Sequence, residues 1–219
     1  MTERSREERT ELTCGQPKRE GQCLNCQAAF QCAPVLLGIK PSNLLIIDSG
    51  SLPEACRLLQ DTSVRITVLF GSWKRNSQGG KIVLFVYRPE LVDPILRDQR
   101  VGEFLESLGY QEKRLDLMLG RLKERYAGCM EKRLPFPHEL GVLLGYPLED
   151  VKGFMKYKGE NFLCSGYWKV YSNENEAKRT FRLYDAVRRD LSCLAGQGMA
   201  VSEAVKCLRA GRLKELAAG

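Results

Sequence analysis

The chain has 219 residues, of which 43% are hydrophobic, and it carries a formal net charge of +7. This length suits one large domain or a domain with an appendage, and the apolar fraction can supply a hydrophobic core. No apolar run approaches the roughly 18 residues that cross a bilayer, and the charged start MTERSREERTEL lacks the apolar stretch of a secretory signal, so we expect a cytoplasmic protein without a membrane span.

The amino-terminal part differs in composition from the rest. Residues 1–25 contain few apolar side chains and many charges of both signs, which is typical of a flexible lead. The sequence therefore predicts a cysteine-containing lead at 1–25 and a single α+β domain at 26–219.

The first elements of that domain are a helix, a strand and a second helix. Residues 26–39 have apolar positions at helical spacing, and Pro34 suits a first helical turn. The apolar run Asn43–Asp48 indicates a strand. Residues 52–61 then predict a helix with Ser51 as a candidate cap.

The clearest β-hairpin follows. Residues 64–73 and 81–89 are rich in β-branched and aromatic side chains, and a polar, glycine-rich segment separates them. Within 64–70 every second side chain, from Val64 to Phe70, is expected to face the core. A strand, a helix and a hairpin together predict a small three-stranded sheet with a helix on one face.

The second half is expected to be mainly helical, which makes the fold class α+β. An aromatic segment at 162–172 is the exception and is expected to be extended. Asn173 and Glu176 form a candidate capping box for the long helix that follows it. The predicted helices are two short ones within 89–110, one at 112–130, a pair joined by Gly145 and Pro147 within 137–155, one at 173–195 and one at 201–216.

Nine cysteines are many for this length. Without a secretion signal, free thiols, metal ligation or redox chemistry are favoured over a disulfide framework. Cys14, Cys23, Cys26 and Cys32 have the spacing C-x8-C-x2-C-x5-C, and a CxxC pair can contribute to a zinc, iron or iron–sulfur site. The alternative is a flexible arm with incidental thiols.

His138 is the only histidine of the chain, and Glu139 follows it at the start of a predicted helix. It is either a local cap or surface residue, or a general base or metal ligand. Cys164 precedes an aromatic run, Tyr167 to Tyr171, that could line a flat cofactor or nucleobase pocket or pack as a core strand.

The positive charge is compatible with an anionic partner, although no nucleic-acid recognition motif accompanies it, so nucleic acid is disfavoured. A basic interaction module predicts a contiguous patch made of Lys113, Arg114, Arg121, Arg125, Lys132 and Arg133.

Several segments together resemble an uncharacterised bacterial family, found mainly in anaerobes and known only as a domain of unknown function. They are QCAPVLLGIKPSNL, VYRPELV, FPHELGVLLGYPLEDVKGF and CSGYWKVYSNENEAKRTFRLYD, and they cover roughly residues 31–190. The resemblance implies a small cytosolic protein without an assigned reaction. It also implies a shared Cys32, His138, Glu139 and Cys164, while many members have histidine where this chain has Gln31.

The leading hypothesis is a ligand- or metal-binding protein linked to redox or iron physiology, with a redox protein as a candidate partner. Cys32, His138 and Cys164, near Glu139, would be its metal ligands or border its pocket. The competing hypothesis is an enzyme with Cys164 or Cys32 as nucleophile and His138 as base. The expected binding residues are Cys32, Tyr146, Tyr167, Trp168, Lys169 and Tyr171.

Overall fold

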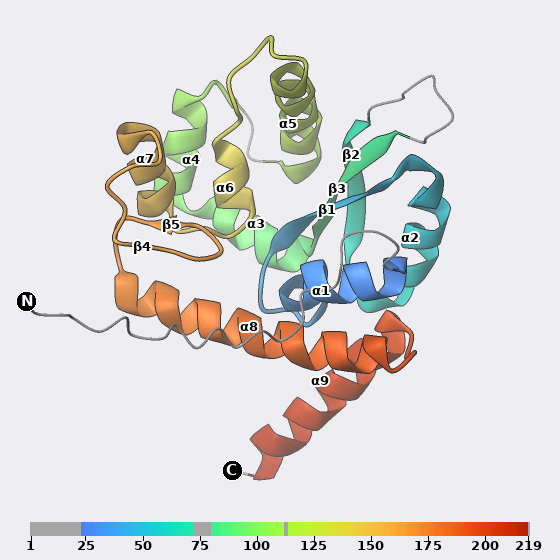
Figure 1. Cartoon of the computed structure of the whole chain (residues 1–219). Coiled ribbons are helices and arrows are strands. Elements are labelled where there is room, and N and C mark those ends of the chain that lie inside the picture. Colours follow the sequence, from blue (N-terminus) through green and yellow to red (C-terminus); the bar gives the residue numbers. More distant parts are fainter. Residues whose placement is uncertain (1–22, 72–79, 112–113, 219) are drawn as a thin grey trace, which may run out of the picture.

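The computed structural model of the protein describes residues 23–71, 80–111 and 114–218. The fold is α+β, with a small three-stranded antiparallel sheet in the first half and helices in the second half, which confirms the predicted class (Figure 1). The elements in chain order are α1 Leu24–Leu36, β1 Ser42–Asp48, η1 Ser49–Ser51, α2 Leu52–Leu59, η2 Gln60–Thr62, β2 Arg65–Gly71, β3 Lys81–Tyr87, α3 Pro89–Arg97, α4 Gln99–Ser107, α5 Leu115–Met130, α6 Glu139–Leu143, α7 Leu148–Tyr157, β4 Cys164–Ser165, β5 Lys169–Val170, α8 Glu174–Gly196 and α9 Val201–Ala218.

The three-stranded sheet has the order β1-β3-β2, with β3 antiparallel to both neighbours. The β2–β3 pair is the predicted hairpin, and the residues that join its strands lie outside the described ranges. β1 pairs with β3 over its whole length, from Ser42 opposite Tyr87 to Asp48 opposite Lys81. Within this sheet the first strand along the chain therefore lies beside the third.

The predicted alternation along β2 ends at a β-bulge. The register with β3 shifts between Val68 and Phe70. Val64 and Val68 pack on one side of the sheet, whereas Leu69 and Phe70 both pack on the other. A bulge places two residues opposite one, so Leu69, expected on the outer face, is fully buried.

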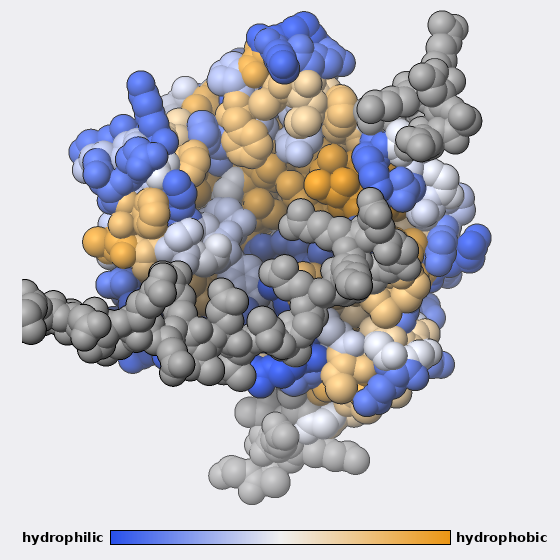
Figure 2. Space-filling view, viewed as in Figure 1, coloured by the Kyte–Doolittle hydropathy of each residue, from blue (hydrophilic) through white to orange (hydrophobic). Residues whose placement is uncertain are grey.

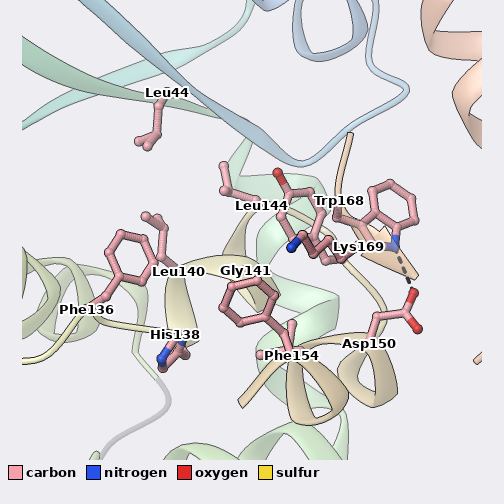
Figure 3. A pocket seen from close by; sticks show the side chains of 12 residues that line it. Leu44, Phe136, His138, Leu140, Gly141, Leu144, Asp150, Phe154, Trp168 and Lys169 are labelled. Carbon is pink, nitrogen blue, oxygen red and sulfur yellow. Dashed lines mark hydrogen bonds between the residues drawn. The ribbon is translucent and has the colours of Figure 1, made fainter. Parts of the chain in front are cut away.

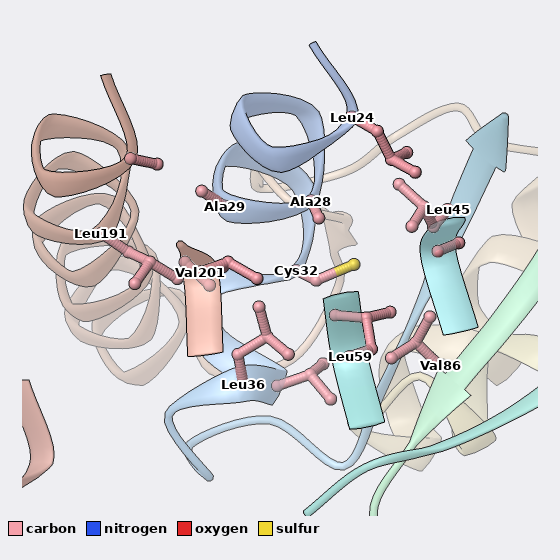
Figure 4. Close-up of a cluster of buried hydrophobic side chains, with 14 of the residues drawn as sticks. Leu24, Ala28, Ala29, Cys32, Leu36, Leu45, Leu59, Val86, Leu191 and Val201 are labelled. Carbon is pink, nitrogen blue, oxygen red and sulfur yellow. The ribbon is translucent and has the colours of Figure 1, made fainter. Parts of the chain in front are cut away.

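Helices cover both faces of the sheet. Every residue of β3 after Lys81 is buried, and alternate side chains of a strand point to opposite faces, so both faces need cover. The first core cluster packs one face against α1, α2, α8 and α9 (Figure 4). The second core cluster packs the other face against α3, α4, α5 and α6.

Helix α1 begins earlier than predicted, so Pro34 lies in its last turn rather than its first. Cys23 caps the helix, and its sulfur accepts a hydrogen bond from the Cys26 backbone N–H. The Pro34 carbonyl accepts from Ile39 and Lys40 at 2.8 and 3.0 Å, where the chain leaves the helix. The proline thus interrupts the helical hydrogen bonds only near the end of the helix.

Arg88 joins this helix end to the sheet. It follows β3, it is 4% exposed, and its Nε donates to the Val35 carbonyl at 2.6 Å. Its Nη2 donates at 2.8 Å both to the Leu36 carbonyl and to the Thr62 carbonyl of η2. One guanidinium therefore donates to carbonyls at the ends of α1 and η2. The Val35 carbonyl also accepts from the Gly38 N–H, and the Leu36 carbonyl also accepts from Arg209 of α9.

The α6–α7 break follows the prediction. Gly145 has φ +78° and ends the turn after α6, and a Cβ there would lie 2.6 Å from Pro41 Cγ. Pro147 is the residue before the first turn of α7. A positive φ and a close backbone approach both require glycine at this position.

No helix within the described ranges is long and apolar enough to cross a membrane.

Replacing Arg88 tests how much the junction depends on it. Arg88→Leu leaves the Thr62 carbonyl without its Arg88 donor and takes one of two donors from each of the Val35 and Leu36 carbonyls, so we expect a loss of about 1.5–3 kcal/mol in the free energy of unfolding measured in urea. Arg97→Leu, on the exposed side of α3, is the control, and its effect should stay within about 0.5 kcal/mol. Equal losses in both variants would contradict this role.

Candidate functional site

A cavity of about 250 Å³ lies where β1, α6, α7 and the β4–β5 hairpin meet. Apolar side chains gather in a hollow of the surface between α6 and the sheet (Figure 2). The close-up shows Leu44 reaching toward the cavity from β1, with Phe136 and His138 on one side and Phe154 of α7 nearby (Figure 3). The lining residues are Leu44, Phe136, His138, Leu140, Gly141, Leu144, Tyr146, Asp150, Val151, Phe154, Trp168 and Lys169.

Aromatic rings form much of the wall. The His138 ring centroid lies 5.6 Å from those of both Phe136 and Phe154. Tyr146 and Trp168 stack with their centroids 5.1 Å apart. Together these rings can contact the flat faces of a guest molecule, and a half-buried imidazole is among them.

Asp150 fixes the hairpin side of the wall. Its carboxylate is 2% exposed and accepts a hydrogen bond from Trp168 Nε1 at 2.7 Å (Figure 3). It also accepts, each at 2.8 Å, from the backbone N–H groups of Tyr171 and Ser172 and from the Ser172 hydroxyl. Asp150 therefore binds the β4–β5 hairpin to α7.

Glu139 fixes the opposite side and does not line the cavity. Its carboxylate is fully buried, and it accepts from Tyr110 Oη at 2.8 Å and from Nε of Arg125 in α5. Burial, together with this hydrogen bond, raises the pKa of Tyr110. Glu139 therefore anchors the start of α6 to the helices behind it.

His138 faces the cavity side of α6 and makes no capping hydrogen bond, although it precedes the helix. Burial lowers the pKa of its imidazole below the ordinary histidine value; the neighbouring Glu139 carboxylate opposes this shift and Arg125 adds to it. At neutral pH the imidazole is uncharged, so it can both donate and accept a hydrogen bond.

The structure brings together four of the predicted site residues and separates the others from them. His138, Tyr146, Trp168 and Lys169 line the cavity. Cys32 lies in the first core cluster with no exposed surface, and burial raises the pKa of its thiol to about 12 (Figure 4).

The other predicted residues of the hairpin lie around the cavity rather than in it. Cys164 is half-buried in β4 opposite Val170, and it does not line the cavity. Tyr167 donates to Asp185 of α8 at 2.9 Å, and Tyr171 stacks on Tyr157 of α7. These contacts attach the hairpin to the two helices that flank it.

The described part of the chain contains no cluster of side chains suited to bind a metal ion. No group of three or more His, Cys, Asp or Glu side chains there is placed to hold a metal ion. Cys23 and Cys26 lie together at the start of α1, with their sulfur atoms 3.1 Å apart. Cys14 lies outside the described residues.

Several members of the expected basic patch have local partners. Arg125 pairs with buried Glu139, so its charge is largely committed within the fold. Lys113 lies outside the described residues. The remaining local contacts are Arg114 with Asp116, Arg133 with Glu131, and Arg121 over the Tyr110 ring.

Sequence reasoning missed Leu44, Phe136, Asp150 and Phe154 as site residues. Phe136 stands between two prolines and is 46% exposed, and its place beside the cavity is visible only in the structure. Lys40 was also missed: it is 3% exposed, and burial lowers its pKa to about 8. Its amine lies 5.4 Å from the centroid of the Tyr146 ring.

Comparison with known proteins matches a family model to most of the chain. The model of the family described as "Protein of unknown function (DUF3793)" matches residues 28–205. No curated protein and no solved structure matches the chain.

Asp150 can be tested through the tryptophan it binds. Asp150→Asn removes the charge that four donors share, so we expect a loss of about 2–4 kcal/mol in the free energy of unfolding. The emission of Trp168 should also shift, measured in a Trp73→Phe background. The control is Glu149→Gln, which changes the exposed neighbour that pairs with Arg100. Equal changes in stability and in Trp168 emission in both variants would refute the special role of Asp150.

The single histidine makes its titration easy to assign. We expect its NMR midpoint in the folded protein to lie below that in the urea-unfolded chain, which is about 6.5. The unfolded state then binds the proton more tightly, so the free energy of unfolding should fall as pH drops through the unfolded histidine pKa. His138→Gln should remove that slope. A folded midpoint at or above the unfolded one would show instead that Glu139 stabilises the imidazolium.

Proposed function

We propose that this chain, which belongs to the DUF3793 family of proteins of unknown function, binds a small, flat, largely apolar molecule in the cavity beside His138. The observation that carries the proposal is the convergence of two segments, 136–154 and 168–169, whose aromatic side chains surround one cavity. The ligand would carry one polar group that donates a hydrogen bond to the imidazole or accepts one from it.

The size and lining of the cavity support a ligand of this class. Its volume of about 250 Å³ lies just below the usual range of ligand sites, which starts at about 300 Å³, so a small ligand is expected. A single ring system of one or two fused rings suits such a space. The walls of Phe136, Phe154, Tyr146 and Trp168 offer ring faces, and His138 offers the polar contact.

The buried carboxylates support a preformed site. Taking a charge out of water is costly, and apolar replacements of buried ion pairs often leave stability unchanged or higher. Asp150 and Glu139 are nevertheless buried on two sides of this cavity, where they hold Trp168 and the start of α6. Walls that are already rigid lose less conformational entropy when a ligand binds. Buried carboxylates that hold the walls therefore favour binding.

The state of the polar groups favours binding over catalysis. The Asp150 carboxylate already accepts four hydrogen bonds, and Lys169 Nζ donates to the Gly159 carbonyl at 2.6 Å. No cysteine of the described chain lines the cavity, so a thiol nucleophile paired with His138 has no support from this geometry. The link to redox or iron physiology and the cytoplasmic location stay predictions.

Binding can be tested with naphthalene and 2-naphthol, two flat bicyclic molecules that differ by one hydroxyl. We expect both to alter Trp168 emission in a Trp73→Phe background, with 2-naphthol the tighter ligand. His138→Phe should weaken 2-naphthol about fivefold and leave naphthalene nearly unchanged, because only the hydroxyl uses the imidazole.

A filling substitution locates the site. Leu44→Phe adds volume at the β1 wall and should weaken both molecules at least about tenfold. Leu117→Phe makes the same change on an exposed part of α5 and should leave binding as it was. Failure of both molecules and of indole to bind at about millimolar concentration, or equal binding by the two variants, would overturn the proposal.

A further inference from the structure

The CxxC segment places two thiols side by side at the amino end of α1. Cys23 is the residue that caps the helix, and Cys26 lies in its first turn. Their sulfur atoms are 3.1 Å apart. A disulfide needs about 2.0 Å between sulfurs, and residues three apart at a helix start lie within the Cα separation that disulfides span. Small side-chain rotations therefore bring the two sulfurs to bonding distance.

The two thiols differ in access. Cys23 is exposed, so an external reagent meets it first. Cys26 is half-buried, with its sulfur 3.7 Å from the Ala195 carbonyl of α8. The hydrogen bond with Cys23, and then burial, raise the pKa of Cys26, which keeps it protonated until its neighbour has reacted.

The turn that carries the thiols is anchored. Asn25 lies between them, and its Nδ2 donates to the Met199 carbonyl at 2.9 Å. Its Oδ1 accepts from the Val201 N–H at 2.8 Å. Both bonds fasten the CxxC turn to the connection between α8 and α9, so these thiols hold a defined geometry and are not part of a loose arm.

We propose that Cys23 and Cys26 form a redox-active dithiol that exchanges with a disulfide substrate of low molecular weight. The Cys23 thiolate attacks one sulfur of the substrate, forms a mixed disulfide and releases one thiolate. Cys26 then loses its proton to solvent and attacks the Cys23 sulfur, which releases the second thiolate. Two protein thiols and one substrate disulfide become one protein disulfide and two substrate thiols.

This site is independent of the cavity. The family match begins at residue 28, after both cysteines, and neither of them lines the cavity. The dithiol is therefore a property of this chain that stands or falls apart from ligand binding.

Oxidised glutathione is the probe. The full chain, reduced and then exposed to it without oxygen, should gain one disulfide between Cys23 and Cys26, found by mass spectrometry after alkylation and reversed by reduced glutathione. In Cys26→Ser, Cys23 should stop at a stable mixed disulfide with glutathione. In Cys23→Ser neither product should form, because the exposed attacking thiol is gone.

The exposed thiol of Cys56 in α2 supplies the matched control, since Cys56→Ser should leave the product unchanged. Iodoacetamide should modify Cys23 at least about tenfold faster than Cys26. Three outcomes would overturn the proposal: no disulfide at any glutathione ratio, a disulfide that joins either cysteine to Cys14, or a zinc ion held by both thiols that blocks their oxidation.

Discussion

The fold depends on one buried guanidinium. Arg88 stands where β3 ends, and its donors reach the carbonyls of Val35 and Leu36 at the end of α1 and of Thr62 at the end of η2. Each of these backbone groups is shielded from water by the elements packed on it and would be costly without a partner. The side chain of Arg88 therefore links the end of β3 to α1 and η2, two of the elements beside the first core cluster.

Buried carboxylates likewise join separate elements around the cavity. Asp150 binds the hairpin to α7 through Trp168 and two backbone N–H groups, and Glu139 binds α6 to Arg125. Buried charges of this kind add little net stability, but they specify which segments meet and at what spacing. The protein thus uses polar groups at the junctions between elements and apolar groups inside the two core clusters.

Much of the fold was visible in the sequence because the signals are local. The hairpin, the break at Gly145 and the Asn173 cap depend on residues close together in the chain, and the structure has all three. The bulge at Leu69 was not predicted, and neither was the set of helices that covers each face of the sheet. A bulge depends on how a strand meets its partner, and cover on a sheet depends on helices that come much later in the chain.

For the site, the sequence was enough to name His138, Tyr146, Trp168 and Lys169 as candidate site residues. The tertiary structure shows that these four share a cavity, that Cys32 is buried apart from them, and that the Asp150 carboxylate holds Trp168 in the cavity wall. The two kinds of feature differ in the sequence separation of the residues that make them. Periodicity, caps and turns act over a few residues, whereas the wall between α7 and the hairpin is made by hydrogen bonds that join Asp150 to residues 18 to 22 positions later.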